Sequence, residues 1–247
     1  MPFDAKRLVI LDQIDSTNNY AMEMVQLGEL AHGDAVFALD QTAGKGRMGR
    51  TWRSERGANL ILTLVVQMQW LPVVDQFRLS AAVSLGCRDF FQENIKENLK
   101  IKWPNDIYIN DSKAGGILIE NVIKGNLWQW AVIGIGLNLN QVHFESMDPP
   151  ATSLKAHTGK DHDVLEAAHA LHRGILKRIE GVASGGFPQM LEEYNHHLYG
   201  RGKKVRLRKE NVTFETTILG VSPAGELVAR DVLERRFLTN EVSWKAL

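Results

Sequence analysis

A glycine-rich segment early in the chain brings several cations close to a large aromatic ring. It reads DQTAGKGRMGRTW over residues 40–52, and residues 44–50 alone hold three glycines and three cations. Glycine permits backbone conformations in which peptide N–H groups and cationic side chains converge on one anion. Such a density of charge suits a polyphosphate or a charged acyl-phosphate intermediate. We therefore expect an anion-binding loop whose cations are Lys45, Arg47 and Arg50.

The same glycines spell G-x-G-x-x-G, the fingerprint of a dinucleotide-binding site, but the surroundings do not fit it. That fingerprint opens directly into a helix and is followed about 20 residues later by an acidic residue. Here the loop runs through Thr51 into a strand-like segment, and residues 64–70 contain no acid. The sequence also lacks a P-loop pattern. A solvated loop between strands, or a basic loop that touches RNA, stays open at this point.

The pentapeptide KWPND forms a second cluster of polar groups at the end of an expected strand. Lys102 supplies a point charge, Trp103 a flat apolar surface, and Pro104 fixes a turn. Asn105 and Asp106 present oxygens there, which makes them candidate ligands for magnesium or for a ribose. A plain turn with a solvent-facing aspartate is the simpler interpretation.

Two further groups have the chemistry of a ligand site. Lys113 precedes Gly115, Gly116 and a buried-looking strand, so we expect its ammonium over a pocket. The DSTN segment stands at an expected helix N-terminus, where it serves at least as a helix cap. Its side chains would also offer donors and acceptors to a small polar ring. They are Ser16, Thr17 and Asn18.

Hydrophobic patterning predicts the strands and helices that must position these groups. Strands are expected at 7–14 and 35–39, in GANLILTLVVQ, in IKWPNDIYINDSKAGGILIE and in WQWAVIGIGLNLN. Helices are expected from DSTNN to near residue 28, and over 77–95, 164–179 and 187–198. From 199 onward the pattern alternates in twos, and strands at 204–209, 213–221, 226–230 and 242–244 predict a small antiparallel barrel. We place the domain boundary there, which gives domains 1–198 and 199–247.

Composition limits the class of protein. The chain has 247 residues and equal numbers of acidic and basic residues, 29 of each, which argues against a nucleic-acid coat. Its single cysteine, Cys87, cannot form an internal disulfide. The N-terminus lacks the apolar segment of a signal peptide, and the longest apolar run falls far short of the ~20 residues of a membrane span. We expect a soluble, cytoplasmic protein.

Six motifs occur in a fixed order: DSTN, QTAGKGRMGRTW, GANL, KWPND, K-x-GGIL-x-E and GIGLNLN. Each is weak alone, but the set resembles the biotin protein ligases, also called biotin–[acetyl-CoA-carboxylase] ligases. The resemblance implies an α/β (α+β) fold: a mixed sheet with helices, related to class II aminoacyl-tRNA synthetases, plus a small C-terminal SH3-like β-barrel. We expect the monofunctional type without an N-terminal DNA-binding domain, because DSTN begins at residue 15.

The resemblance also implies an activity. Biotin would react with ATP to give biotinyl-5′-AMP, and the biotinyl group would pass to a lysine of a biotin carboxyl carrier protein. The implied cofactors are ATP and Mg²⁺, with biotin as substrate. The implied partner is the carrier domain of acetyl-CoA carboxylase or of another biotin-dependent carboxylase, with no DNA and no membrane, and a homodimer stays open. Lys45 stands where the family usually has arginine, and Asp40 where glutamate is frequent.

The residues of the site follow from the same resemblance. Arg47 and Lys113 would be catalytic. Biotin-binding residues would be Ser16, Thr17, Asn18, Gln41, Gly44, Lys45, Gly46, Arg47, Lys113, Gly115 and Gly116. ATP-binding residues would be Arg50, Trp52, Asn59, Lys102, Asn105, Asp106 and Asn138, with Asn105 and Asp106 as candidate Mg²⁺ ligands.

A lipoate or octanoate ligase or transferase of the same superfamily is the alternative enzyme. A long acyl chain would need a deep apolar pocket, and a transferase would need no ATP loop. The segments GKGRMGR and KWPND therefore favour the biotin interpretation.

Overall fold

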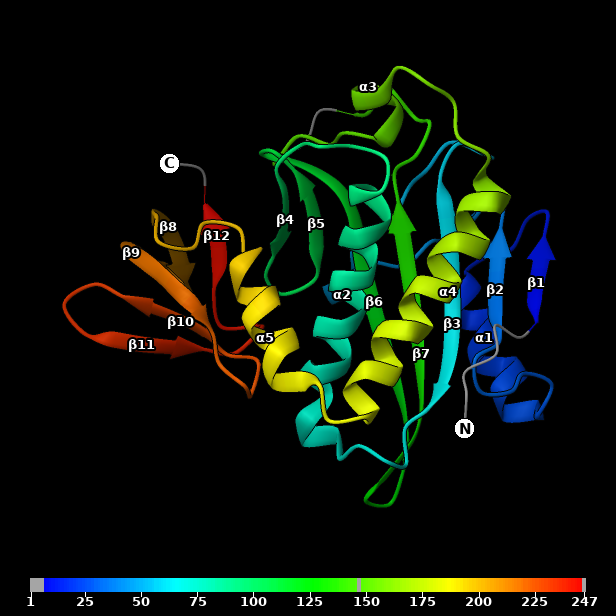
Figure 1. Cartoon of the computed structure of the whole chain (residues 1–247), viewed down its shortest axis with the longest axis horizontal. Helices are drawn as coiled ribbons and strands as arrows, with labels where there is room; N and C mark the ends of the chain where they lie inside the picture. The colour runs from blue at the N-terminus through cyan, green and yellow to red at the C-terminus, as the bar shows by residue number, and fades with distance from the viewer. Residues whose placement is uncertain (1–6, 146–147, 246–247) are drawn as a thin grey trace.

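The computed structural model describes residues 7–145 and 148–245, which form two sheets and five α-helices (Figure 1). The larger sheet has seven strands in the order β1-β2-β3-β7-β6-β5-β4. Only β1 and β2 pair in parallel; the other neighbours are antiparallel. Its strands are β1 (Leu8–Leu11), β2 (Ala35–Ala38), β3 (Leu60–Gln67), β4 (Leu99–Lys102), β5 (Asp106–Ile109), β6 (Ser112–Lys124) and β7 (Leu127–Leu137).

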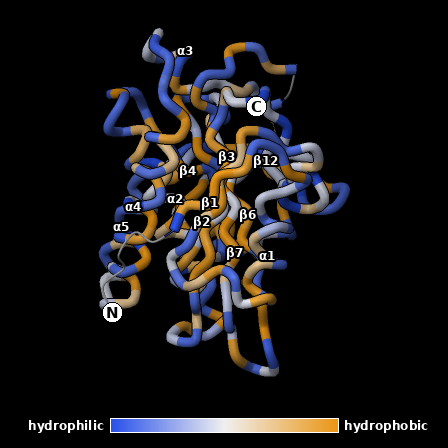
Figure 2. Tube along the Cα trace, turned by 90° about the vertical axis from the view of Figure 1, so that its right-hand side faces the viewer, coloured by the Kyte–Doolittle hydropathy of each residue, from blue (hydrophilic) through white to orange (hydrophobic). Residues whose placement is uncertain are grey.

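Helices cover the two faces of this sheet unequally. The helices are α1 (Thr17–Leu27), α2 (Gln76–Gln92), α3 (Leu154–Thr158), α4 (Val164–Ala183) and α5 (Phe187–His196). Both α2 and α4 pack on one face, whereas α1 packs on the other, against β3 and β7 (Figures 1 and 2). On its face, α1 contacts β2, β3 and β7, and the glycine-rich loop lies beside β6. The site residues described below lie on this face, from the start of α1 across β7 and β6 to β5 and β4.

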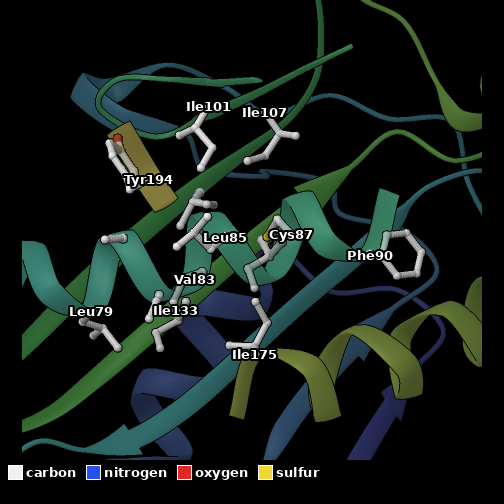
Figure 3. Packing of buried hydrophobic residues seen from close by; sticks show 14 of the residues in the cluster. Leu79, Val83, Leu85, Cys87, Phe90, Ile101, Ile107, Ile133, Ile175 and Tyr194 are labelled. Atoms are coloured by element: carbon white, nitrogen blue, oxygen red, sulfur yellow. The ribbon is translucent and has the colours of Figure 1, made fainter. Parts of the chain in front are cut away.

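The main core lies between the sheet and α2, α4 and α5. Val83, Leu85 and Cys87 of α2 meet Ile133 of β7 and Ile175 of α4 (Figure 3). All five are buried, which explains the long apolar runs of β3 and β7 and the 3- to 4-residue spacing of the helices. Burial raises the pKa of the Cys87 thiol, so this cysteine is a packing residue.

The second sheet follows α5 along the chain. It contains β8 (Lys204–Lys209), β9 (Val212–Val221), β10 (Leu227–Arg230), β11 (Glu234–Phe237) and β12 (Ser243–Lys245), in the order β11-β10-β9-β8-β12. It abuts the edge of the larger sheet, where Ile101 of β4 pairs with Leu198. Trp103 is only 2% exposed, and its indole N–H donates to the carbonyl of Gly225 at 3.0 Å. The flat apolar surface that the sequence assigns to Trp103 is therefore buried, and it anchors the C-terminal sheet.

The mixed α/β architecture predicted from the sequence is confirmed, with some differences at its margins. The strands at 204–209 and 213–221 fall within one residue of the prediction. The helix expected over 77–95 ends at Gln92, and the short elements α3 and β11 were not predicted. The pairings among the described residues form an open order with β11 and β12 at its ends, so we describe a sheet where a barrel was expected. The boundary at residue 198 stays a prediction.

A network of ion pairs ties three helices together behind the core. Arg178 of α4 donates to Asp89 of α2 at 2.7 Å and to both carboxylate oxygens of Glu193 of α5, at 2.6 and 2.8 Å. These hydrogen bonds hold the pKa of Glu193 below its ordinary value. The pair therefore stabilises the fold above the ordinary glutamate pKa, and its contribution is lost as the pH falls into the acid range below it.

Arg178→Met should lower the free energy of unfolding by about 2 kcal/mol, because it leaves two half-buried carboxylates without their shared donor. Urea titration at neutral pH checks the magnitude. The loss should shrink as the pH falls below the ordinary glutamate pKa, since protonation removes the interaction in the parent too. An equal loss at acid and neutral pH would contradict this account.

Candidate functional site

A row of paired residues crosses the uncovered face of the sheet. Gly136 of β7 pairs with Gly116 of β6, and Gly116 pairs with Asp106 of β5. Asp106 pairs in turn with Lys102 of β4. The two glycines leave a bare patch of backbone beside charged side chains, and we call them the glycine floor.

The indole ring of Trp52 lies on this floor. A Cβ built on Gly136 would lie 2.5 Å from the Cε2 atom of that ring, and one on Gly116 would lie 3.5 Å from its Cζ3 atom. The same Cβ on Gly116 would lie 3.5 Å from the ammonium nitrogen of Lys113. The indole N–H of Trp52 is buried and has no hydrogen-bond partner among the described residues. Because unpaired buried donors are rare, this N–H is available to an acceptor on a ligand.

A cluster of buried polar side chains, which we call the polar pocket, lies next to the floor where α1 begins. The Thr63 hydroxyl lies 2.8 Å from the Thr17 hydroxyl and 2.7 Å from Oδ1 of Asn18. The side-chain amide of Asn18 donates to Glu120 at 2.8 Å. The backbone N–H and the hydroxyl of Thr17 both lie within hydrogen-bond distance of Gln41 Oε1. Ordered polar groups in such a place can recognise the donors and acceptors of a small ring.

This pocket also contains Ser16, which is buried but makes no side-chain cap hydrogen bond to α1. Asn18 fits closely above Gly134 of β7, because a Cβ on that glycine would collide with its side-chain amide. The start of α1 is thus held against the sheet by a glycine contact and by the hydrogen bonds of Thr17 and Asn18.

The glycine-rich loop closes beside both features. Gly46 N–H donates to the Arg50 carbonyl at 2.7 Å, and Trp52 N–H donates to the Gly44 carbonyl at 2.9 Å. Between them Met48 has a φ of 56°, a left-handed conformation, and the residue is 74% exposed. A cleft of about 460 Å³ is lined by this loop and by Leu118 and Glu120 of β6.

Two cations reach the floor from different segments. The guanidinium of Arg47 donates to Oδ1 of Asn105 at 3.1 Å, and the ammonium of Lys113 lies 2.7 Å from Asp106. Partial burial lowers the pKa of Arg47, while the charge of Asp106 opposes that shift. The loop and the KWPND motif, about 58 residues apart, therefore meet at one end of the glycine floor.

Lys45 makes a different contact. Its ammonium lies 3.6 Å from Glu120, and both side chains are substantially exposed. Arg50 is exposed, and its backbone carbonyl closes the loop as described above. Of the loop cations, Arg47 is the one whose hydrogen bond crosses to the KWPND motif.

The geometry argues against direct magnesium binding by Asn105 and Asp106. Oδ1 of Asn105 accepts from Arg47, and the amide nitrogen of Asn105 donates to the Ile117 carbonyl at 2.8 Å. Asp106 is paired with Lys113. A divalent cation bound to both side chains would lie against two positive groups, so these residues do not fit a direct Mg²⁺ site while Arg47 and Lys113 hold these contacts. No cluster of three or more His, Cys, Asp or Glu with metal-binding geometry occurs within 7–145 and 148–245.

Two of the predicted nucleotide-binding residues have side chains engaged by the chain itself. The Asn59 amide donates to Gln141 at 2.6 Å and accepts from the Leu139 N–H at 3.0 Å. The Asn138 amide donates to the Thr152 carbonyl at 2.9 Å. Both side chains therefore hold the segment after β7, which is hydrogen-bonded to the backbone of Lys113 through Thr152. Contact of Asn59 and Asn138 with a nucleotide stays a prediction.

Sequence reasoning missed Thr63 and Glu120 of the polar pocket. The signals were present, since Thr63 interrupts an apolar strand and Glu120 closes the K-x-GGIL-x-E motif. What the sequence did not give was the register that places both beside Asn18. Gly115 is also near the site, but its missing side chain makes room for Leu137.

The chain matches the family model described as "Biotin/lipoate A/B protein ligase family" over residues 10–138. It is 30% identical over 229 residues to the bifunctional ligase/repressor BirA of Bacillus spizizenii, which covers 90% of this chain and 69% of that protein. It is 31% identical over 205 residues to the biotin–[acetyl-CoA-carboxylase] ligase of Mycobacterium tuberculosis, covering 82% of this chain and 74% of that protein.

A solved structure of the biotin protein ligase of Aquifex aeolicus, in complex with biotin and ATP, matches with a TM-score of 0.83 and 25% identity. The match covers 97% of this chain and 99% of that one. The chain therefore belongs to the biotin/lipoate A/B protein ligase family. Within it, its relatives and its fold place it with the biotin protein ligases.

The site has two halves, the glycine floor under Trp52 and the polar pocket at Asn18, and substitutions of Gly136 and Gly134 should impair them separately. Gly136→Ala displaces Trp52 and should weaken binding of ATP by about 10- to 100-fold, because a small misplacement near the floor is costly. Gly134→Ala displaces Asn18 and should weaken binding of biotin instead. Isothermal titration calorimetry with each ligand measures both effects.

Gly174→Ala on α4 is the matched control, since a Cβ there meets open space. It should leave both affinities unchanged. If Gly136→Ala and Gly134→Ala weaken the same ligand equally, the division of the site into two halves is wrong.

Proposed function

We propose that this chain attaches biotin to a lysine of a biotin carboxyl carrier protein, using ATP and passing through biotinyl-5′-AMP. The observation that carries the proposal is the meeting of Arg47 and Lys113 at one end of the glycine floor, with the polar pocket of Asn18 at the other. One end suits phosphate and carboxylate oxygens, and the other suits a polar ring.

In the first step the biotin carboxylate attacks the α-phosphorus of ATP, the P–O bond to the β-phosphate breaks, and pyrophosphate leaves. The reactants are both anions, so their repulsion opposes the approach. Two unit charges 4 Å apart interact by about 4 kcal/mol near a protein surface. Arg47 and Lys113 offset this repulsion, and in exchange they release Asn105 and Asp106. Positioned charges of this kind stabilise the charge that develops in the transition state.

In the second step the lysine amine of the carrier attacks the acyl carbon of the mixed anhydride, AMP leaves, and the amine loses a proton. Between the steps the anhydride must be kept from water. We propose that residues 44–50 cover it as a lid, because the loop lines the cleft beside the floor and contains three glycines. The carrier of acetyl-CoA carboxylase, or of another biotin-dependent carboxylase, is the proposed acceptor.

We propose that Mg²⁺ accompanies the phosphates of ATP rather than binding to Asn105 and Asp106 directly. Their side chains orient Arg47 and Lys113 in the structure, and that orienting role requires no metal.

The polar pocket favours biotin over lipoate or octanoate. An acyl chain that broke the hydrogen bonds among the buried side chains of Thr17, Asn18 and Thr63 would leave these polar groups unpaired. The ring of biotin carries its own donors and acceptors and can pair with them.

No helix within residues 7–145 and 148–245 is long and apolar enough to span a membrane.

Incubation of the chain with ATP, Mg²⁺, biotin and a biotin carboxyl carrier domain should give a carrier band on an avidin blot. The band should be absent without ATP or when the acceptor lysine of the carrier is replaced. Parallel reactions with labelled lipoate and octanoate should give no transfer. Transfer of either of these, with none of biotin, would contradict the proposal.

Lys113→Ala should lower the rate of biotin-dependent ATP–pyrophosphate exchange by about 10²–10³-fold, because it removes one positioned charge. Lys155→Ala is the matched control, since Lys155 pairs with Asp161 on the surface of α3, outside the site. Lys113→Arg keeps the charge and should retain more activity than Lys113→Ala. Exchange by Lys113→Ala at the rate of the parent would refute the role given to Lys113.

A further inference from the structure

The ammonium of Lys102 is surrounded by three aromatic rings. It lies 4.8 Å from the ring centroid of Tyr108, 5.4 Å from that of Tyr199 and 5.5 Å from that of Trp244. It also donates to the Tyr108 hydroxyl at 3.1 Å. We call these three rings the lysine cage.

Both sheets contribute to the lysine cage. Tyr108 stands on β5 of the larger sheet and Trp244 on β12 of the C-terminal sheet. Tyr199 follows α5, where its backbone N–H donates to the Ile101 carbonyl at 2.9 Å, so that this segment extends the edge of β4. The indole N–H of Trp244 donates to the Trp103 carbonyl at 3.3 Å. The ring of Trp244 is thus fixed by the residue next to Lys102.

The charge of Lys102 is stabilised by these rings rather than by a salt bridge. Among the described residues no carboxylate lies within ion-pair distance of its ammonium, and Asp106 is paired with Lys113. Burial lowers the pKa of Lys102, and the charge of Asp106 opposes the shift. A cation held over aromatic faces keeps its charge while giving up part of its hydration. Such a group binds an incoming anion without first breaking an ion pair.

Lys102 stands in the row that contains the glycine floor, beyond Asp106. It therefore lies on the side of the site where Lys113 and Arg47 gather, away from the polar pocket. Anionic groups of a nucleotide bound at the floor would extend toward it.

We propose that Trp244 and Tyr199 are positioning residues, which hold the Lys102 ammonium toward the phosphates of ATP and so make nucleotide binding depend on the C-terminal sheet. This inference rests on the proposed function. If the two rings merely pack the sheets together, their removal will act on stability and not on ATP in particular.

Trp244→Ala should raise the KM for ATP in the exchange reaction by roughly fivefold, within the range expected for the loss of one partly desolvated cation–π contact. The affinity for biotin and the kcat should stay near those of the parent. Trp244→Phe keeps a ring and should restore most of the KM. In a Lys102→Ala background, Trp244→Ala should raise KM no further, because the group that the ring positions is gone.

Phe214→Ala is the matched control, since it removes a ring of the same C-terminal sheet that packs on Phe237 and not on Lys102. It should leave the KM for ATP unchanged. Thermal unfolding of every variant shows which of them are folded under the assay conditions.

NMR of the protein labelled with ¹³C at lysine Cε tests the cage without any enzyme assay. The Lys102 methylene resonance, assigned through Lys102→Arg, should be shifted upfield by the rings in the parent and move toward the position of ordinary lysines in Trp244→Ala. A Lys102 resonance at the ordinary position in the parent would overturn the cage.

Different results would overturn the positioning role of Trp244 and the proposed ligase function. A shifted resonance together with an unchanged KM for ATP in Trp244→Ala would overturn the positioning role while leaving the ligase function intact. Equal effects of Trp244→Ala in the presence and absence of Lys102 would overturn it too. Absence of exchange in a folded parent would overturn the proposed function, and with it the nucleotide role, although the resonance would still report the cage.

Discussion

Repulsion between a carboxylate and a polyphosphate is the constraint on which the organisation of this molecule depends. Two features of one sheet face would reduce this repulsion. Gly116 and Gly136 let the indole ring of Trp52 lie against the backbone, where its buried N–H has no partner among the described residues, and cations stand at one end of this floor. The helices that build the core pack on the opposite face, so the reactive face needs no side chains for stability over this stretch.

Without ligands, these cations are held by partners from the chain. Lys113 pairs with Asp106, Arg47 with Asn105 and Lys45 with Glu120. Such contacts keep like charges close together, and partly exposed pairs of this kind are weak enough to exchange for an anionic ligand. Lys102 differs, because aromatic rings of both sheets hold it. The C-terminal sheet therefore contacts one of the cations of the site through the ring of Trp244.

Much of this arrangement is readable from the sequence. The apolar runs predicted the buried strands and six ordered motifs predicted the family, whereas anion binding by the glycine-rich loop stays a prediction. The parts that escaped depend on register and on tertiary contact. Glu120 is next to Asn18 only because β6 pairs with β7 in one particular register. Trp103 is buried, and its indole N–H bonds to Gly225, more than 100 residues away in sequence. Nothing local in either segment encodes such a contact.

A crystal structure of the chain with biotin and a non-reactive ATP analogue tests the central claim most directly. We expect Arg47 and Lys113 to lie within hydrogen-bond distance of the biotin carboxylate or the α-phosphate, with residues 44–50 folded over both ligands. The hydrogen bond to Asn105 and the ion pair with Asp106 should be lengthened or broken. Ligands bound elsewhere, or a loop directed away from them with both contacts intact, would contradict the account.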